Sequence, residues 1–216
     1  MERLQMLHLA VLLSLSAGLA AQENEAEVYR IDIPQSDIHW RVYKAGALAR
    51  FGHNHVISVE TADGEIFAYP DSPRSGFELI IPVADLVIDD PELRERYGED
   101  FSSVPSAADI EGTRGNMLGD QVLNAEQFGE LRLSADKLLA ESGSGMIDFT
   151  LEIVGHTVEL TVPAEIAIDT RTIVVRGEFG LALTELDMVP FSALMGALSV
   201  ADHMDFTYVI HATKVE

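Results

Sequence analysis

Two histidines two positions apart, His53 and His55, are the residues of this chain whose type and spacing best suit chemistry. On a β-strand the side chains at i and i+2 project from the same face, so neutral imidazoles at this spacing can share a metal ion. A metal site needs at least one more ligand. The candidates are carboxylates and the remaining histidines of the folded chain: His39, His156, His203 and His211. The alternative is that both imidazoles hydrogen-bond backbone groups at a bend permitted by Gly52.

The sequence contains no other constellation typical of catalysis. It has no cysteine, no Gly-x-Ser-x-Gly element and no recognisable Ser/His/Asp pattern. It also lacks a phosphate-binding loop and a dinucleotide-binding fingerprint, so we expect no cofactor. We therefore predict a binding protein and not an enzyme, while the paired histidines keep a metalloprotein or a His-dependent enzyme as the alternative.

The elements that must position these histidines are long β-strands. Apolar residues occupy every second position through most of residues 145–184, with a turn predicted at Gly155-His156, and the pattern recurs at 38–42 and 202–214. The predicted inner face comprises Trp40, Val42, Ile147, Phe149, Leu151, Val158, Leu160, Val162, Phe179, Leu181, Phe206 and Tyr208.

Strands of this length indicate a barrel. They are about twice the usual five or six residues, and long twisted antiparallel strands bury one face most easily by closing on themselves. We predict an all-β protein, an extended antiparallel up-and-down β-barrel of about eight strands. A barrel of that size either fills its interior with side chains or encloses a small ligand, and periodicity alone leaves both open.

Two segments interrupt the strand pattern. Residues 91–128 are rich in charge and alanine, and they predict a short helical insertion in which Ser106 begins a helix. The apolar segment 188–198 predicts a loop or short helix at one end of the barrel.

Composition excludes several partners. The 216 residues include 36 acidic and 14 basic side chains, which gives a formal charge of −22. Such a charge repels nucleic acid and opposes adsorption of the whole molecule to anionic lipid surfaces. The absence of cysteine means that the fold is stabilised without disulfides and has no thiol at risk in an oxidising compartment.

The N-terminus predicts export. Arg3 precedes an apolar run, and small residues follow that run up to Ala21, so residues 1–21 read as a secretory signal peptide. The run is shorter than the ~20 apolar residues that a membrane-spanning helix needs. We expect residues 22–27 to be disordered, a first strand near Val28 and a single domain over residues 28–216.

Short motifs along the whole mature chain resemble the YceI-like family of exported, lipocalin-like proteins that bind polyisoprenoid lipids. They are Tyr29-Arg30-Ile31-Asp32, Phe77 to Val83, Leu86 to Asp89, Ile110-Glu111-Gly112-Thr113, Leu151 to Thr157, Gly177-Glu178-Phe179, Pro190-Phe191-Ser192 and the closing strand Asp202 to Ala212. The paired histidine departs from the family's common pattern.

The resemblance implies a periplasmic carrier whose apolar barrel holds an isoprenoid or another long-chain lipid, for example one with a quinone-like head. The twelve inner-face residues would then contact the lipid, and His53 and His55 become candidates for its head group, with no metal and no stable membrane insertion expected. The interaction partners that we consider are a membrane redox or lipid-handling protein and a second copy of the chain.

Overall fold

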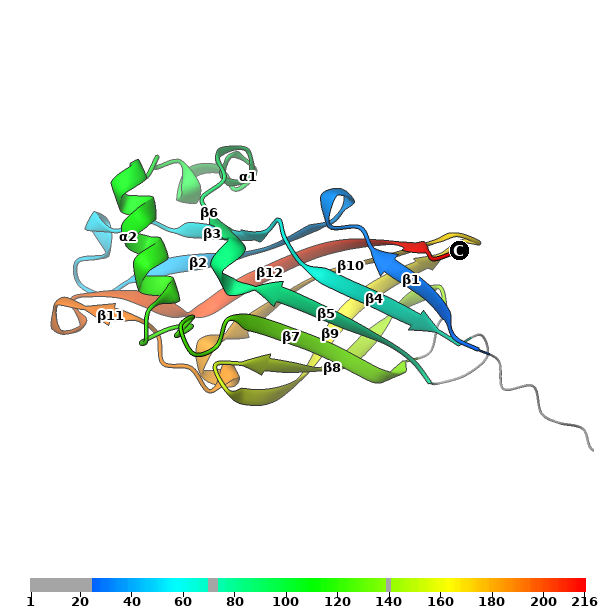
Figure 1. The fold of residues 1–216 in the computed structure, drawn as a ribbon. Helices are drawn as coiled ribbons and strands as arrows, with labels where there is room; N and C mark the ends of the chain where they lie inside the picture. Colours follow the sequence, from blue (N-terminus) through cyan, green and yellow to red (C-terminus); the bar gives the residue numbers. More distant parts are fainter. Residues whose placement is uncertain (1–24, 70–73, 139–140) are drawn as a thin grey trace, which may run out of the picture.

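The computed structural model describes residues 25–69, 74–138 and 141–216, which form a sheet of twelve strands (Figure 1). The strands are β1 (Glu27–Ile31), β2 (Asp37–Ala45), β3 (His55–Val59), β4 (Asp63–Ala68), β5 (Ser75–Pro82), β6 (Leu86–Ile88), β7 (Glu130–Leu138), β8 (Gly143–Ile153), β9 (His156–Ile168), β10 (Thr172–Ala182), β11 (Ser192–Ala193) and β12 (Leu198–Lys214). The helices are α1 (Pro91–Glu95) and α2 (Ala107–Leu118). Within these ranges no helix is long and apolar enough to cross a membrane. The predicted signal peptide 1–21 lies outside them.

Eight of the strands close into an antiparallel barrel. Around its wall the order is β1, β4, β5, β7, β8, β9, β10, β12, and pairing of β12 with β1 closes the ring. Each strand follows its neighbour in chain order, as in an up-and-down barrel. The predicted all-β, lipocalin-like barrel of about eight strands is therefore confirmed.

Strand β12 is long enough to serve two partners along one edge. Near its C-terminus it pairs with β1, through Tyr29 and Lys214, and earlier it pairs with β2, through Val42 and Met204. Pro34 separates β1 from β2 within a short 3-10 turn. Strands β3 and β6 continue from β2, so the wall extends beyond the closed ring toward α1 and α2 (Figure 1).

The predicted helical insertion at 91–128 is confirmed and covers this extension. Ser106 caps α2, as the sequence predicts, and it also forms a capping box with Asp109. Side chains of α2 and of the loop after it pack against the main hydrophobic core: Ile110, Met117, Leu118 and Val122. Helix α1 covers the outer face of the extension, where Leu93 and Phe101 bury Val56 completely.

The strand alternation is confirmed, but two boundaries differ from prediction. Ile153 pairs with His156, so the two-residue turn is Val154-Gly155 and not Gly155-His156. Both turn residues have positive φ, 48° and 76°, which matches the backbone twist that a two-residue hairpin requires. At the N-terminus β1 begins at Glu27, one residue before the predicted start, where Glu27 pairs with the ammonium of Lys214 at 2.6 Å. This part of the predicted disordered segment 22–27 is therefore ordered.

Candidate functional site

The interior of the barrel, which we call the lumen, is lined by the residues that alternation assigns to the inner face. All twelve belong to one hydrophobic cluster. Four of them are buried: Phe149, Leu151, Val162 and Leu181. The other eight pack against the same cluster and keep part of their surface accessible to solvent. Their placement agrees with the prediction, while their contact with a lipid stays a prediction.

Aromatic rings form one wall of the lumen. Phe206 of β12 stacks on Phe179 of β10, with centroids 4.9 Å apart, and on Trp40 of β2, at 5.8 Å. Tyr208 meets Phe179 edge to face at 6.3 Å. This wall offers flat, polarisable surfaces to a hydrocarbon ligand without placing a charge in the lumen.

A short ladder between β9 and β10 leaves a seam in the same wall. The strands pair only from Ile173 to Arg176, because Pro163 of β9 has no N–H to continue the ladder. The hydroxyl of Tyr208 donates instead to the Pro163 carbonyl at 2.6 Å, and burial raises the pKa of Tyr208 to about 12. The phenol is therefore neutral at physiological pH. A surface cavity of about 410 Å³ lies beside this contact.

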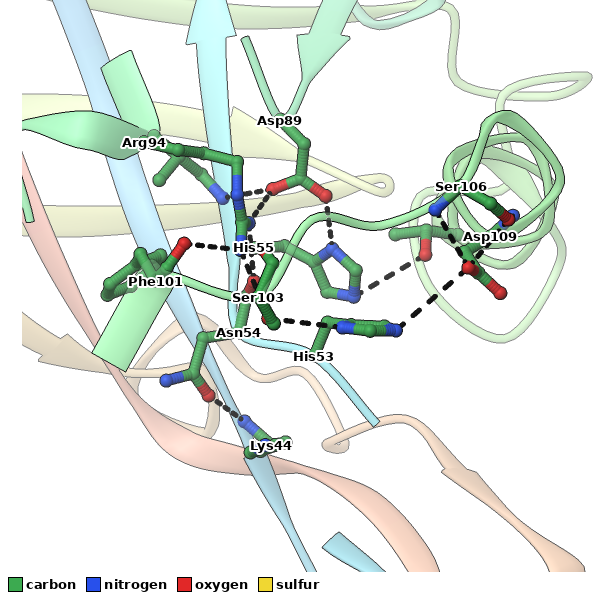
Figure 2. A network of polar contacts seen from close by, with 12 residues as sticks. Lys44, His53, Asn54, His55, Asp89, Arg94, Phe101, Ser103, Ser106 and Asp109 are labelled. Atoms are coloured by element: carbon green, nitrogen blue, oxygen red, sulfur yellow. Dashed lines mark hydrogen bonds and ion pairs between the residues drawn. The ribbon is translucent and has the colours of Figure 1, made fainter. Parts of the chain in front are cut away.

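A polar network occupies the end of the barrel that carries α2, which we call the helical end (Figure 2). Its centre is Asp89, whose side chain is fully buried. Asp89 accepts hydrogen bonds from His55 Nδ1 at 2.6 Å, from the Val56 backbone at 3.0 Å and from the guanidinium of Arg94. Arg94 also donates to three backbone carbonyls, so it links α1 to the segment before β3 and to the segment after α1. These carbonyls belong to Asn54, Phe101 and Ser103, at 2.7 to 3.0 Å.

The local sequence explains this geometry. Asp89 follows β6 directly and takes a left-handed conformation with φ 58°, which turns the chain into α1. Asp90 then caps α1 by accepting from the Leu93 backbone at 2.9 Å, with Pro91 at the first position of the helix. The carboxylate of Asp89 and the guanidinium of Arg94 thereby reach the same buried point.

The electrostatics of the network fix the tautomer of His55. Burial by itself would raise the pKa of Asp89, but the hydrogen bonds from His55 and the Val56 backbone and the charge of Arg94 together lower it. Asp89 is therefore ionised and can only accept, so His55 carries a proton on Nδ1. In the neutral ring Nε2 is then an acceptor, 3.4 Å from the hydroxyl of Thr113 on α2. The chemistry available there is hydrogen bonding to a hydroxyl or N–H of a ligand.

His53 lies in the bend after Gly52, because β3 begins at His55, so the strand spacing that the metal hypothesis requires is absent. Its Nδ1 lies 3.2 Å from the hydroxyl of Ser103 and its Nε2 lies 4.0 Å from Asp109 of α2. The rings of His53 and His55 are 6.3 Å apart and inclined by 67°. Each histidine thus faces its own carboxylate.

The structure does not bring a third ligand to this pair. Across residues 25–69, 74–138 and 141–216 no three His, Asp or Glu side chains gather in a way that could hold a metal ion. His39 points to the outer face of β2, where it contacts Asp37 and Tyr97, and His203 contacts Asp205. The described residues of the helical end therefore form a hydrogen-bonded network.

The opposite end of the barrel carries a different polar group. Tyr29, Glu27 and Lys214 share the inner face there, and Tyr29 donates to Glu27 at 3.0 Å beside the ion pair with Lys214. Tyr29 is only 2% exposed. The apolar lumen thus lies between two polar ends, which suits a ligand with a long apolar part.

The sequence analysis missed Asp89, Arg94 and Thr113. The pair Asp90-Pro91 is a helix-start signal that could have located α1, and hence Arg94 one turn later. Nothing in the sequence could show that Arg94 turns back to Asp89, or that α2 brings Thr113 to His55, 58 residues away.

Taken together, the closed ring and the apolar inner face define an antiparallel, lipocalin-like β-barrel. No protein-family model matches the sequence, and no curated protein matches it either. Solved structures do match the fold.

The fold is that of YceI proteins. The chain is similar to Burkholderia cenocepacia BcnA, with a TM-score of 0.59 and 13% identity over 85% of this chain and 99% of that one. It is also similar to the YceI protein of Campylobacter jejuni, with a TM-score of 0.52 and 12% identity over 74% of this chain and 85% of that one. The similarity inferred from sequence motifs is thus confirmed at the level of the fold.

Proposed function

We propose that this chain is a periplasmic carrier that holds a polyisoprenoid or similar amphiphilic lipid in its lumen. The observation that carries the proposal is the set of inward-facing apolar side chains that keep accessible surface between two polar ends. The fold shared with YceI structures supports it, because the family that the sequence resembles binds polyisoprenoid lipids.

The dimensions and energetics of the barrel suit such a ligand. Strand β9 has 13 residues, which corresponds to about 44 Å at ~3.4 Å per residue. Each isoprene unit has five carbons, so its burial contributes roughly 3 to 4 kcal/mol at ~0.8 kcal/mol per CH₂. Three or four enclosed units offset an association cost of ~4 to 15 kcal/mol. The tail would therefore supply most of the affinity, which suits a protein that acts by binding.

The polar residues of the helical end would determine which lipid head group binds. His55 Nε2 lies beside the inner face there and can accept from a hydroxylated head, while the nearby Thr113 hydroxyl can donate to a carbonyl of a quinone-like head. A pyrophosphate is a poorer guest, because the formal charge of −22 opposes a second set of negative charges.

The experiment that tests the carrier function is mass spectrometry of lipids extracted from the purified protein. We expect a polyisoprenoid with a neutral head, absent from an unrelated exported protein purified in parallel. A protein that arrives empty and takes up no polyprenyl quinone on incubation would exclude the carrier function.

The proposed location rests on the N-terminal sequence. We expect export to remove the signal peptide, so that the mature chain begins near Ala21 or Gln22. N-terminal sequencing of protein from the periplasmic fraction checks this. An intact Met1 in the membrane fraction would show an anchored protein and contradict the periplasmic assignment.

A further inference from the structure

Two adjacent loops at the helical end expose large apolar side chains. The 3-10 turn Ala49–Phe51 follows β2, and a tight turn at Leu194–Gly196 joins β11 to β12, where the sequence predicts a loop or short helix. Phe51 and Leu194 are each 66% exposed, and Met195 is 105% exposed. We call these three residues the apolar tip. Figure 1 shows β11 and its turn at the extreme left, beyond α2.

The backbone holds the two loops together. The Leu48 N–H donates to the Ala197 carbonyl at 2.7 Å. Gly46, with φ 90°, comes so close that a Cβ there would lie 2.6 Å from the same carbonyl oxygen. The two loops are therefore held together by backbone contacts and form one structural unit.

The conformation of the hairpin turn is costly for its residues. Leu194 and Met195 both have positive φ, 51° and 56°, a region that residues with a branched or long side chain rarely adopt. This backbone directs Met195 fully into solvent. Strain of this kind often marks a functional surface.

The tip also differs in charge from the rest of the molecule. No acidic residue occurs from Ile38 to Val59, and no charged residue occurs from Met188 to Ala201, although the chain has 36 acidic side chains. Arg50 lies over the ring of Phe51 at 4.6 Å, and the ammonium of Lys44 binds the Gly52 carbonyl. The tip is thus apolar with two basic side chains behind it.

We propose that the apolar tip is a reversible docking surface for the interface of a phospholipid bilayer. Exposed apolar side chains backed by basic ones match the acyl region and the phosphates of such an interface. At physiological salt the Debye length is about 8 Å, so acidic residues farther from the surface repel it only weakly. A contact by three side chains is weak, which suits a protein that must leave the membrane again.

This surface lies where a lipid cargo could be exchanged. The tip is the continuation of β2 and β12, whose inner faces carry Trp40 and Phe206 of the lumen. The inference goes beyond the proposed function, since docking does not require that the chain carry a lipid.

The experiment uses the absence of cysteine from the chain. Met195→Cys and Met146→Cys are each labelled with an environment-sensitive fluorophore. Met146 is the matched control, because it is a 61% exposed methionine on the outer face of β8. Vesicles of phosphatidylethanolamine and phosphatidylglycerol are then added to each labelled variant of the mature protein.

We expect a blue shift and protection from an aqueous quencher at position 195 but not at position 146. In sedimentation with the same vesicles, Leu194→Ser combined with Met195→Ser should lower the bound fraction at least roughly tenfold, because two apolar side chains no longer insert. Met146→Ser should leave it unchanged. Circular dichroism confirms that every variant is folded.

Three outcomes would overturn the proposal. They are no shift at position 195, an equal shift at both positions, and a shift at 195 that grows with protein concentration without vesicles, which would indicate a second copy of the chain. A protein that docks but arrives empty and takes up no polyprenyl quinone on incubation would refute the carrier function and leave the docking surface standing.

Discussion

Asp89→Asn should lower the free energy of unfolding by about 3 kcal/mol, the low end of the roughly 3 to 5 kcal/mol for breaking a buried ion pair. The substitution keeps the shape of the side chain but leaves the buried guanidinium of Arg94 without its counterion. Arg94 keeps its backbone carbonyl partners, which is why the low end applies. Urea denaturation followed by circular dichroism measures the change.

The control is Asp148→Asn on the outer face of β8, where Asp148 is exposed and accepts from Thr161 at 2.6 Å. We expect stability close to that of the unmodified protein there. Equal losses in the two variants would show that Asp89 and Arg94 do not form the stabilising pair that the structure places at the helical end.

The same carboxylate predicts a pH dependence with a definite sign. The pKa of Asp89 is lowered in the folded protein, so its stabilisation is complete above the unfolded pKa of about 3.9 and is lost as pH falls through the folded pKa. In Asp89→Asn the loss of stability on acidification should be shallower. It should not vanish, because the pKa values of Asp37 and Asp205 are also lowered and these residues remain.

The barrel could be predicted because its signal is local and repeated. Each inward residue of β8 and β9 lies two positions from the next, and this period fixes which face a side chain occupies without any knowledge of the partner strand. For this reason all twelve predicted inner-face residues fall in one cluster. The turn at Val154-Gly155 was misplaced by one residue, because a β-branched residue with positive φ contradicts the local preference.

The polar network could not be predicted in the same way. It depends on single residues far apart in sequence, such as His55 and Asp89, brought together by a left-handed residue and a one-turn helix. The paired histidines suggested a metal site on the assumption that both lie on one strand. Strand β3 begins at His55, so His53 lies outside it and the assumed spacing does not exist. The short hydrogen-bonded ladder between β9 and β10 also depends on a single residue, Pro163, and so could not be predicted from a repeated pattern.

Phe179→Asp should abolish most lipid retention while leaving the barrel folded. Phe179 lies on the inner face of β10 and is only partly buried, so the carboxylate would disturb the packed core less than at a fully buried position. An ionised group facing a hydrocarbon chain loses solvation without gaining a partner, a cost of several kcal/mol. We therefore expect retention of extracted or reloaded polyprenyl quinone to fall by tenfold or more.

Two further variants separate this effect from a general loss of structure. Glu178→Ala alters the exposed outer face of the same strand and should retain lipid like the unmodified protein. Phe179→Leu keeps an apolar side chain at the lumen and should retain most of the lipid, although it loses the stack with Phe206. If folded Phe179→Asp protein, verified by circular dichroism, retains as much lipid as Glu178→Ala, the ligand does not lie against β10 and the lumen is not its binding site.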